Sequence, residues 1–142
     1  MGAVGSVADR IPGIFSWLGA RGIAPAGPPF FRYHVIDMER QLLVEAGVPV
    51  VSPVAGDDGD VRGGILPAGR FAVMTHAGAP ETLAAATSAL LDWARERGLA
   101  WDVSRTDAGE RWGCRLESYL TDPVQQPDMS KWQTELAFRL AD

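Results

Sequence analysis

One order of predicted elements occurs twice along this chain of 142 residues, on either side of an Asp- and Gly-rich segment at residues 54–61. Before it, apolar spacing predicts a helix over residues 7–22 and strands over 30–35 and 41–51. After it, the pattern predicts a strand over 62–76, a helix over 80–97, and strands over 111–121 and 133–140. The halves therefore resemble two β-α-β-β units, of which the first retains only Ala3, Val4 and Val7 for its opening strand.

This order predicts an α+β fold in which the strands pair into antiparallel sheets with helices on one side. The length predicts one domain over residues 1–142. Within it we expect a first repeat over about residues 1–53, a linker over about 54–61, and a second repeat over about 62–142.

Charge and motif content exclude several classes of protein. With 13 basic and 18 acidic residues and no basic cluster, direct nucleic-acid binding is not expected. Neither a membrane-spanning run nor a signal peptide is found, so we expect a soluble, cytoplasmic protein. His34 and His76 lack partners at metal-ligand spacing, and no cofactor motif occurs, so neither metal nor cofactor is expected. The single Cys114 is expected to be a small buried hydrophobe, and a homodimer is compatible with these features.

Residues 111–121 (RWGCRLESYLT) alternate like a strand and are the most informative segment. The alternation places five residues on a mainly apolar face: Trp112, Cys114, Leu116, Ser118 and Leu120. It places the other five on the opposite face: Arg111, Gly113, Arg115, Glu117 and Tyr119. Trp112 is therefore expected in the core, unless a bulge at Gly113 turns it.

Glu117 and Tyr119 are two residues apart, so their side chains share one face of this strand. A carboxylate in aromatic surroundings is poorly solvated and attracts cations. The alternative is a solvent-exposed face on which Glu117 forms an ion pair with Arg115 or Arg111. From the residues alone, both interpretations stay open.

Other aromatic residues and His76 occupy predicted strands or helices. Trp93 lies on the apolar face of the helix over 80–97 and is expected in the core. Phe30 and Phe31 point to opposite faces of their strand, so one is expected to be buried and the other to be available to a ligand. His76 ends a predicted strand, where a structural hydrogen bond is the alternative to a catalytic role.

Short motifs extend over nearly the whole chain. They are GPPFFRYH at 27–34, VEAGVPV at 44–50, LPAG at 66–69, FAV at 71–73, HAG at 76–78, Trp93, LESYLTDP at 116–123 and WQTEL at 132–136. In this order and at these distances, the chain resembles the GyrI-like small-molecule-binding domain. That family includes the gyrase-inhibitory protein, the effector-binding domains of AraC-type and MerR-type multidrug regulators, and stand-alone proteins.

The resemblance implies two pseudo-symmetric β-α-β-β repeats of the SHS2 type, related by a pseudo-twofold axis, with a ligand cleft between them. Glu117 matches the cleft glutamate of multidrug-sensing members, Tyr119 follows at the family's spacing, and Tyr33 matches an aromatic position in the first half. Ala79-Pro80 stands where many members have Pro-Tyr, so one usual aromatic is absent. The ligand-binding candidates are Glu117, Tyr119, Tyr33, Phe31, Trp112 and His76.

Three functions are compatible with this resemblance. The leading one is a stand-alone protein that binds bulky hydrophobic, often cationic small molecules, because the chain begins almost at its first predicted helix, without a helix-turn-helix before it. The second is a hydrolase of cyclopropanoid DNA-alkylating toxins, in which Glu117 activates water and Tyr119 or Tyr33 stabilises developing charge. The third is a protein-interaction module of the gyrase-inhibitor type.

Overall fold

A computed structural model of the chain describes residues 10–37, 41–52, 54, 57–58, 61–107 and 109–141. Its helices are α2 (Ile11–Ala20) and α3 (Leu83–Glu96), with short 3₁₀ turns η1 (Pro80–Thr82) and η2 (Met129–Lys131). Its strands are β1 (Phe30–Asp37), β2 (Gln41–Gly47), β3 (Asp57–Asp58), β4 (Val61–Arg62), β5 (Phe71–Ala77), β6 (Val103–Thr106), β7 (Gly109–Trp112), β8 (Arg115–Tyr119) and β9 (Gln133–Arg139). The opening strand expected at Ala3, Val4 and Val7 lies outside the described residues. No helix in the described ranges is long and apolar enough to cross a membrane.

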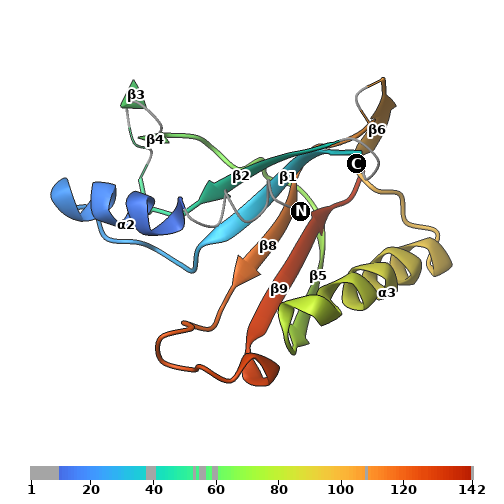
Figure 1. Cartoon of the computed structure of the whole chain (residues 1–142). Helices are drawn as coiled ribbons and strands as arrows, with labels where there is room; N and C mark the ends of the chain where they lie inside the picture. Colours follow the sequence, from blue (N-terminus) through green and yellow to red (C-terminus); the bar gives the residue numbers. More distant parts are fainter. Residues whose placement is uncertain are drawn as a thin grey trace.

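Seven antiparallel strands form the main sheet, and β1 lies at its centre (Figure 1). One edge of β1 pairs with β2, while its other edge pairs first with β8 and then with β7. The β8–β9 and β1–β2 pairs thus lie symmetrically about the β1–β8 pair, as expected for two pseudo-symmetric repeats. The mixed α+β architecture predicted from the sequence is confirmed.

Each main helix ends at a glycine, as the sequence predicts. Gly22 follows α2 with φ of 67°, and Gly98 follows α3 with φ of 69°, a left-handed conformation that costs glycine little. At the C-terminal end of each helix, backbone N–H groups just beyond the helix donate to its last carbonyl groups. Examples are Ile23 to Leu18 and Leu99 to Ala94, at 3.0 Å each. The helix starts also agree with the sequence prediction, since Pro12 lies in the first turn of α2 and Pro80 in the 3₁₀ turn that leads into α3.

The main core lies between α3 and one face of the sheet, which we call the α3 face. Its buried members are Ala72, Ala86, Leu90, Trp112, Leu136, Phe138 and Leu140. Figure 1 shows α3 beside β5 and β9, whereas α2 lies beside β2, at the opposite edge of the sheet. The expectation that Trp93 is buried is wrong: it is 41% exposed and stacks under the Arg97 guanidinium, 4.4 Å from the ring centre. The apolar stripe of α3 is narrower than predicted, because Ala86, Leu90 and Ala94 alone are buried.

The strand predicted over residues 111–121 is two strands, β7 and β8, interrupted at Gly113 and Cys114. Phe31 of β1 pairs with Glu117, and Val35 of β1 pairs with Arg111. These pairs are four residues apart on β1 but six residues apart on the β7–β8 segment, so that segment has two extra residues between them. The interruption reverses the alternation, and Trp112 therefore lies on the same face as Arg115 rather than opposite it.

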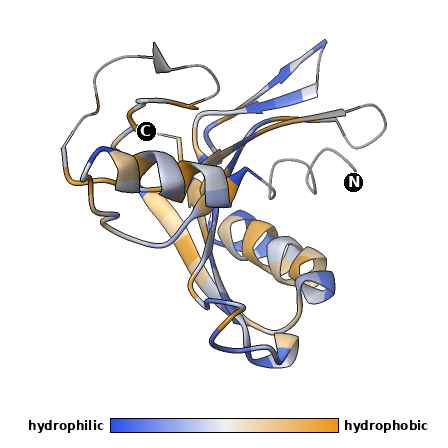
Figure 2. Cartoon of the chain, turned by 60° about the vertical axis from the view of Figure 1, so that its left-hand side comes forward, coloured by the Kyte–Doolittle hydropathy of each residue, from blue (hydrophilic) through white to orange (hydrophobic). Residues whose placement is uncertain are grey.

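β6 was not predicted, although Asp107 and Gly109 mark a turn directly after it. It forms a hairpin with β7 that is mostly hydrophilic (Figure 2). Because three of the four β6 residues are exposed, this strand lacks the apolar alternation that would identify it from sequence.

Candidate functional site

Glu117 lies on β8, in the middle of the sheet and on the α3 face. It is directly opposite Phe31 of β1 and Leu136 of β9, and cross-strand partners of this kind share a face. Phe31 and Leu136 are 3% and 0% exposed. The carboxylate of Glu117 is therefore attached to a half-buried position flanked by buried apolar residues.

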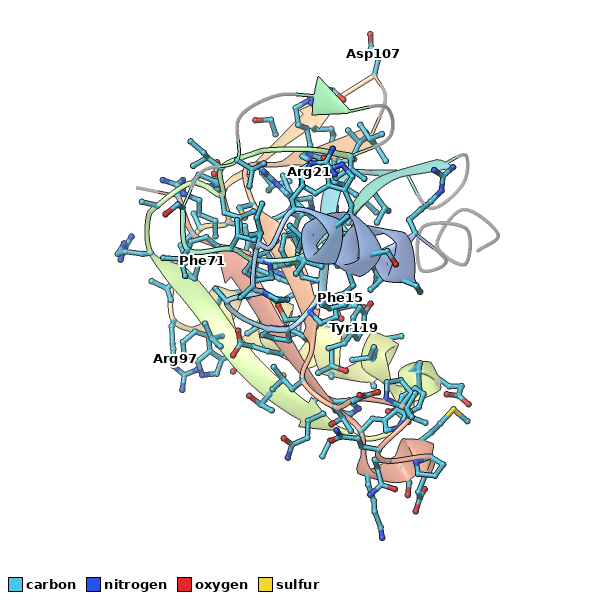
Figure 3. The ribbon with its side chains drawn as sticks, turned by 90° about the vertical axis from the view of Figure 1, so that its left-hand side faces the viewer. Phe15, Arg21, Phe71, Arg97, Asp107 and Tyr119 are labelled. Carbon is cyan, nitrogen blue, oxygen red and sulfur yellow. The ribbon has the colours of Figure 1, made fainter. Side chains whose placement is uncertain are left out.

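Three aromatic residues surround this carboxylate, and together with it they form what we call the Glu117 cluster: Phe31, Tyr33, Glu117 and Tyr119. The Tyr119 hydroxyl donates a hydrogen bond of 2.7 Å to Oε1 of Glu117. The Phe31 ring lies edge to face with both phenol rings, and its centre is 5.2 Å from the ring centre of Tyr119 and 6.4 Å from that of Tyr33. In Figure 3, Tyr119 and Phe15 of α2 are drawn between the ribbons of α2 and α3. Sequence alternation predicts Glu117 with Tyr119, but the β1–β8 register is what adds Phe31 and Tyr33.

Both phenols of the cluster hold their protons firmly. Burial raises the pKa of Tyr119 well above its ordinary value, and the negative charge of Glu117 raises it further. The same two causes, in the same order, raise the pKa of Tyr33. At ordinary pH the cluster therefore presents neutral phenols, which act as hydrogen-bond donors, beside a carboxylate.

Arg115 completes the α3 face of β8, opposite Phe138. Its guanidinium lies over the rings of Phe138 and Trp112, at 4.4 and 4.8 Å from their centres, and 5.9 Å from that of Tyr33. No ion pair joins Arg115 to Glu117 among the described residues. The alternative in which these two residues pair on a solvent-exposed face therefore does not describe this structure. The sequence indicates that Arg115 shares a strand face with Glu117, because the two residues are two positions apart.

The other two candidates lie away from the Glu117 cluster. Trp112 is 5% exposed and packs against Trp101 and Phe138 in the core, so Arg115 covers it. His76 lies on β5, two strands from Tyr119 through Thr134. The Thr82 hydroxyl donates to the Ala79 carbonyl and therefore accepts from Nε2 of His76, at 2.6 Å. His76 is thus engaged in a hydrogen bond at the start of α3.

Two hollows on the surface lie elsewhere. One of about 500 Å³ lies between α3 and β5, lined by residues that include Val73, Met74 and Trp93. Another of about 600 Å³ adjoins the end of α2, lined by residues that include Trp17 and Val51. Neither of these two includes Glu117 among its lining residues.

A family model described as the GyrI-like small molecule binding domain matches residues 7–141. No curated protein matches the sequence.

Three solved structures have the same fold. The EcmrR chain of a cryo-EM structure of an EcmrR–DNA complex has a TM-score of 0.70 and 19% identity, over 98% of this chain and 50% of that one. The crystal structure of the EcmrR C-terminal domain has a TM-score of 0.70 and 21% identity, over 97% and 84%. An uncharacterized conserved protein from Listeria innocua has a TM-score of 0.56 and 15% identity, over 81% and 64%. This chain spans half the length of the EcmrR chain in the DNA complex, and these identities show the fold alone.

Proposed function

Because this chain belongs to the GyrI-like family of small-molecule binding domains, we propose that its Glu117 cluster binds bulky, planar, hydrophobic and often cationic small molecules. In this proposal the chain recognises or sequesters such molecules, among them drugs or toxins. The observation that carries the proposal is a carboxylate held by a phenol within a group of three aromatic rings.

The two parts of the cluster contribute differently to such binding. Aromatic rings supply a large contact area and attract cations through their negative faces. The carboxylate of Glu117 supplies a full charge, and the hydrogen bond from Tyr119 holds it in place. Because the site is half-buried, a charged group there is less screened than on an open surface. A cation with flat apolar sides satisfies both parts at once.

Replacing Glu117 with Gln tests the proposal, because it removes the charge and preserves the size. We expect the affinity for rhodamine 123, a planar cationic dye, to fall by about 1–3 kcal/mol in calorimetry. Binding of Nile red, a neutral planar dye, should change far less. Glu135→Gln is the matched control, because Glu135 pairs with Ser118 on the other face of the same sheet. Equal affinity of Glu117→Gln and the unmodified protein for the cation would contradict the proposal.

The second candidate function is hydrolysis of cyclopropanoid toxins. Two phenols that keep their protons flank the carboxylate, and a neutral phenol can stabilise charge that develops on a substrate oxygen. Tyr119 and Tyr33 both interact with Glu117, so either phenol is a candidate donor to a substrate in this alternative. Product analysis separates the two functions: a binder returns a cyclopropanoid probe intact after long incubation, whereas a hydrolase returns it opened, and Glu117→Gln abolishes that opening.

A further inference from the structure

The guanidinium of Arg115 is a half-buried positive charge without a hydrogen-bond or ion-pair partner in the described part of the chain. It makes no hydrogen bond and no ion pair with any described residue. Its contacts are instead with ring faces, chiefly those of Phe138 and Trp112. Burial is the main cause that lowers the pKa of Arg115, while the charges of Glu117 and Glu110 and the Tyr33 phenol act in the opposite direction. The surroundings therefore compensate this charge only in part.

The N–H groups of Arg115 are available for hydrogen bonding. A guanidinium carries five N–H donors in one plane, and in Arg115 none of them donates a hydrogen bond to a described residue. Such a fork binds a carboxylate through two parallel hydrogen bonds. Within the chain, Glu117 does not supply these bonds, because its Oε1 accepts from Tyr119 and no ion pair joins it to Arg115.

Arg115 and Glu117 are two residues apart on one strand, so they point to the same face about 7 Å apart. The rings of Tyr33 and Phe31 lie beside them, Tyr33 toward Arg115 and Phe31 opposite Glu117. The site thus has a negative and a positive group side by side along one aromatic surface. A planar molecule that carries both charges at a similar separation matches it.

We infer that the ligands preferred by this site are zwitterionic aromatic molecules, whose cationic part faces Glu117 and whose carboxylate is bound by the guanidinium of Arg115. This inference rests on the proposed function, which requires only the cation. It adds Arg115 as the residue that determines specificity among the molecules that Glu117 attracts.

A matched pair of dyes tests this specificity. Rhodamine 110 has a free carboxylate, and rhodamine 123 is its methyl ester, so the two differ only in the group that Arg115 would bind. We expect the unmodified protein to bind the free acid more tightly than the ester. We also expect the ratio of the ester's Kd to the acid's Kd to fall about tenfold in Arg115→Met, the change expected for losing a charge-assisted hydrogen bond.

Arg115→Met keeps an unbranched apolar side chain over Trp112 and Phe138, which separates the lost charge from lost packing. Arg111→Met is the control, because Arg111 is exposed on the adjoining strand, and its ratio should equal that of the unmodified protein. Folding of each variant is checked by circular dichroism.

The outcomes distinguish the two proposals. If Glu117→Gln weakens rhodamine 123 but the ratio is the same in Arg115→Met, the inference is overturned and the proposed function stands. If Arg115→Met does not fold, the dye pair on the unmodified protein decides, and an ester that binds as tightly as the acid overturns the inference. If rhodamine 123 binds independently of Glu117, the proposed function fails, and the inference fails with it.

Discussion

Tyr33 and Tyr119 are the only two tyrosines of the chain, and both belong to the Glu117 cluster. Burial first, and then the negative charge of Glu117, raises the pKa of each phenol above its usual value of about 10. Since a phenolate beside a carboxylate would place two negative charges together, the folded protein strongly favours the neutral phenols. The absorbance of tyrosine therefore reports on this cluster alone.

We predict that phenolate absorbance appears in the folded protein well above pH 10, and near pH 10 in denaturant. Because the folded state holds these protons more tightly, the free energy of unfolding is unaffected below about pH 10 and falls as pH rises beyond it. Titration with simultaneous circular dichroism checks this, and Glu117→Gln should lower the midpoint. The buried Cys114 thiol, whose pKa is also raised by burial, acts on stability in the same direction, so the phenolate signal is the relevant one. A midpoint near 10 in the folded protein would refute the assignment.

At the scale of elements, the interruption between β7 and β8 determines what lies beside the site. The backbone of Gly113 is held from two sides: its N–H donates to the Asp102 carbonyl at 2.9 Å, and its carbonyl accepts from Arg32 at 2.9 Å. The side chain of Asp102 occupies the space where a Cβ of residue 113 would lie, and Arg139 fixes that carboxylate with an ion pair of 2.8 Å. This arrangement places Trp112 under Arg115.

Gly113→Ala should destabilise the protein by roughly 1–3 kcal/mol, the cost of forcing an extra methyl group into a filled site. Its Cβ would overlap the Asp102 carboxylate, which cannot move without leaving Arg139. Gly19→Ala is the control: nothing lies within 4 Å of its Cβ, and Ala favours the helix, so that change should be neutral or stabilising. Urea unfolding measures both. Equal stabilities of Gly113→Ala and the unmodified protein would show that the interruption does not depend on this glycine.

At the scale of the whole molecule, the β1–β8 pair joins the two halves of the chain. Phe30, Phe31 and Arg32 pair with Ser118, Glu117 and Leu116, so residues 84 to 88 positions apart meet at the centre of one sheet. The helices contact strands at opposite edges of this sheet, α3 at β5 and α2 at β2. The Glu117 cluster takes Phe31 and Tyr33 from one half and Glu117 and Tyr119 from the other, so it exists only when the halves are joined.

We therefore predict that the two halves unfold as one cooperative unit. Amide hydrogen exchange should give β1 and β8 the same free energy of opening, because neither strand can separate without breaking their shared ladder. The largely exposed edge strand β6 provides the internal comparison and should exchange more readily. If β1 and β2 opened at a clearly lower free energy than β8 and β9, the halves would be separate units, contrary to this prediction.

Local features of the sequence account for most of the element order and for half of the candidate site. Pro80 and Gly98 mark the limits of the second helix, and alternation places Glu117 and Tyr119 on one face. Both are short-range effects, since a proline, a glycine or a two-residue period acts on neighbouring residues. The exposure of Trp93 was beyond such reasoning, because a helical pattern does not say how wide a stripe the sheet will cover.

The sequence by itself determined that a carboxylate and a phenol share one strand face in an α+β domain. Only the tertiary structure decided that Phe31 is opposite that carboxylate, that Tyr33 contacts Phe31, and that Trp112 lies under Arg115. The physical reason is that strand register and the interruption at Gly113 depend on contacts between distant residues, such as Asp102 with Arg139. Those contacts form only when the sheet is assembled, so no local pattern in the chain specifies them.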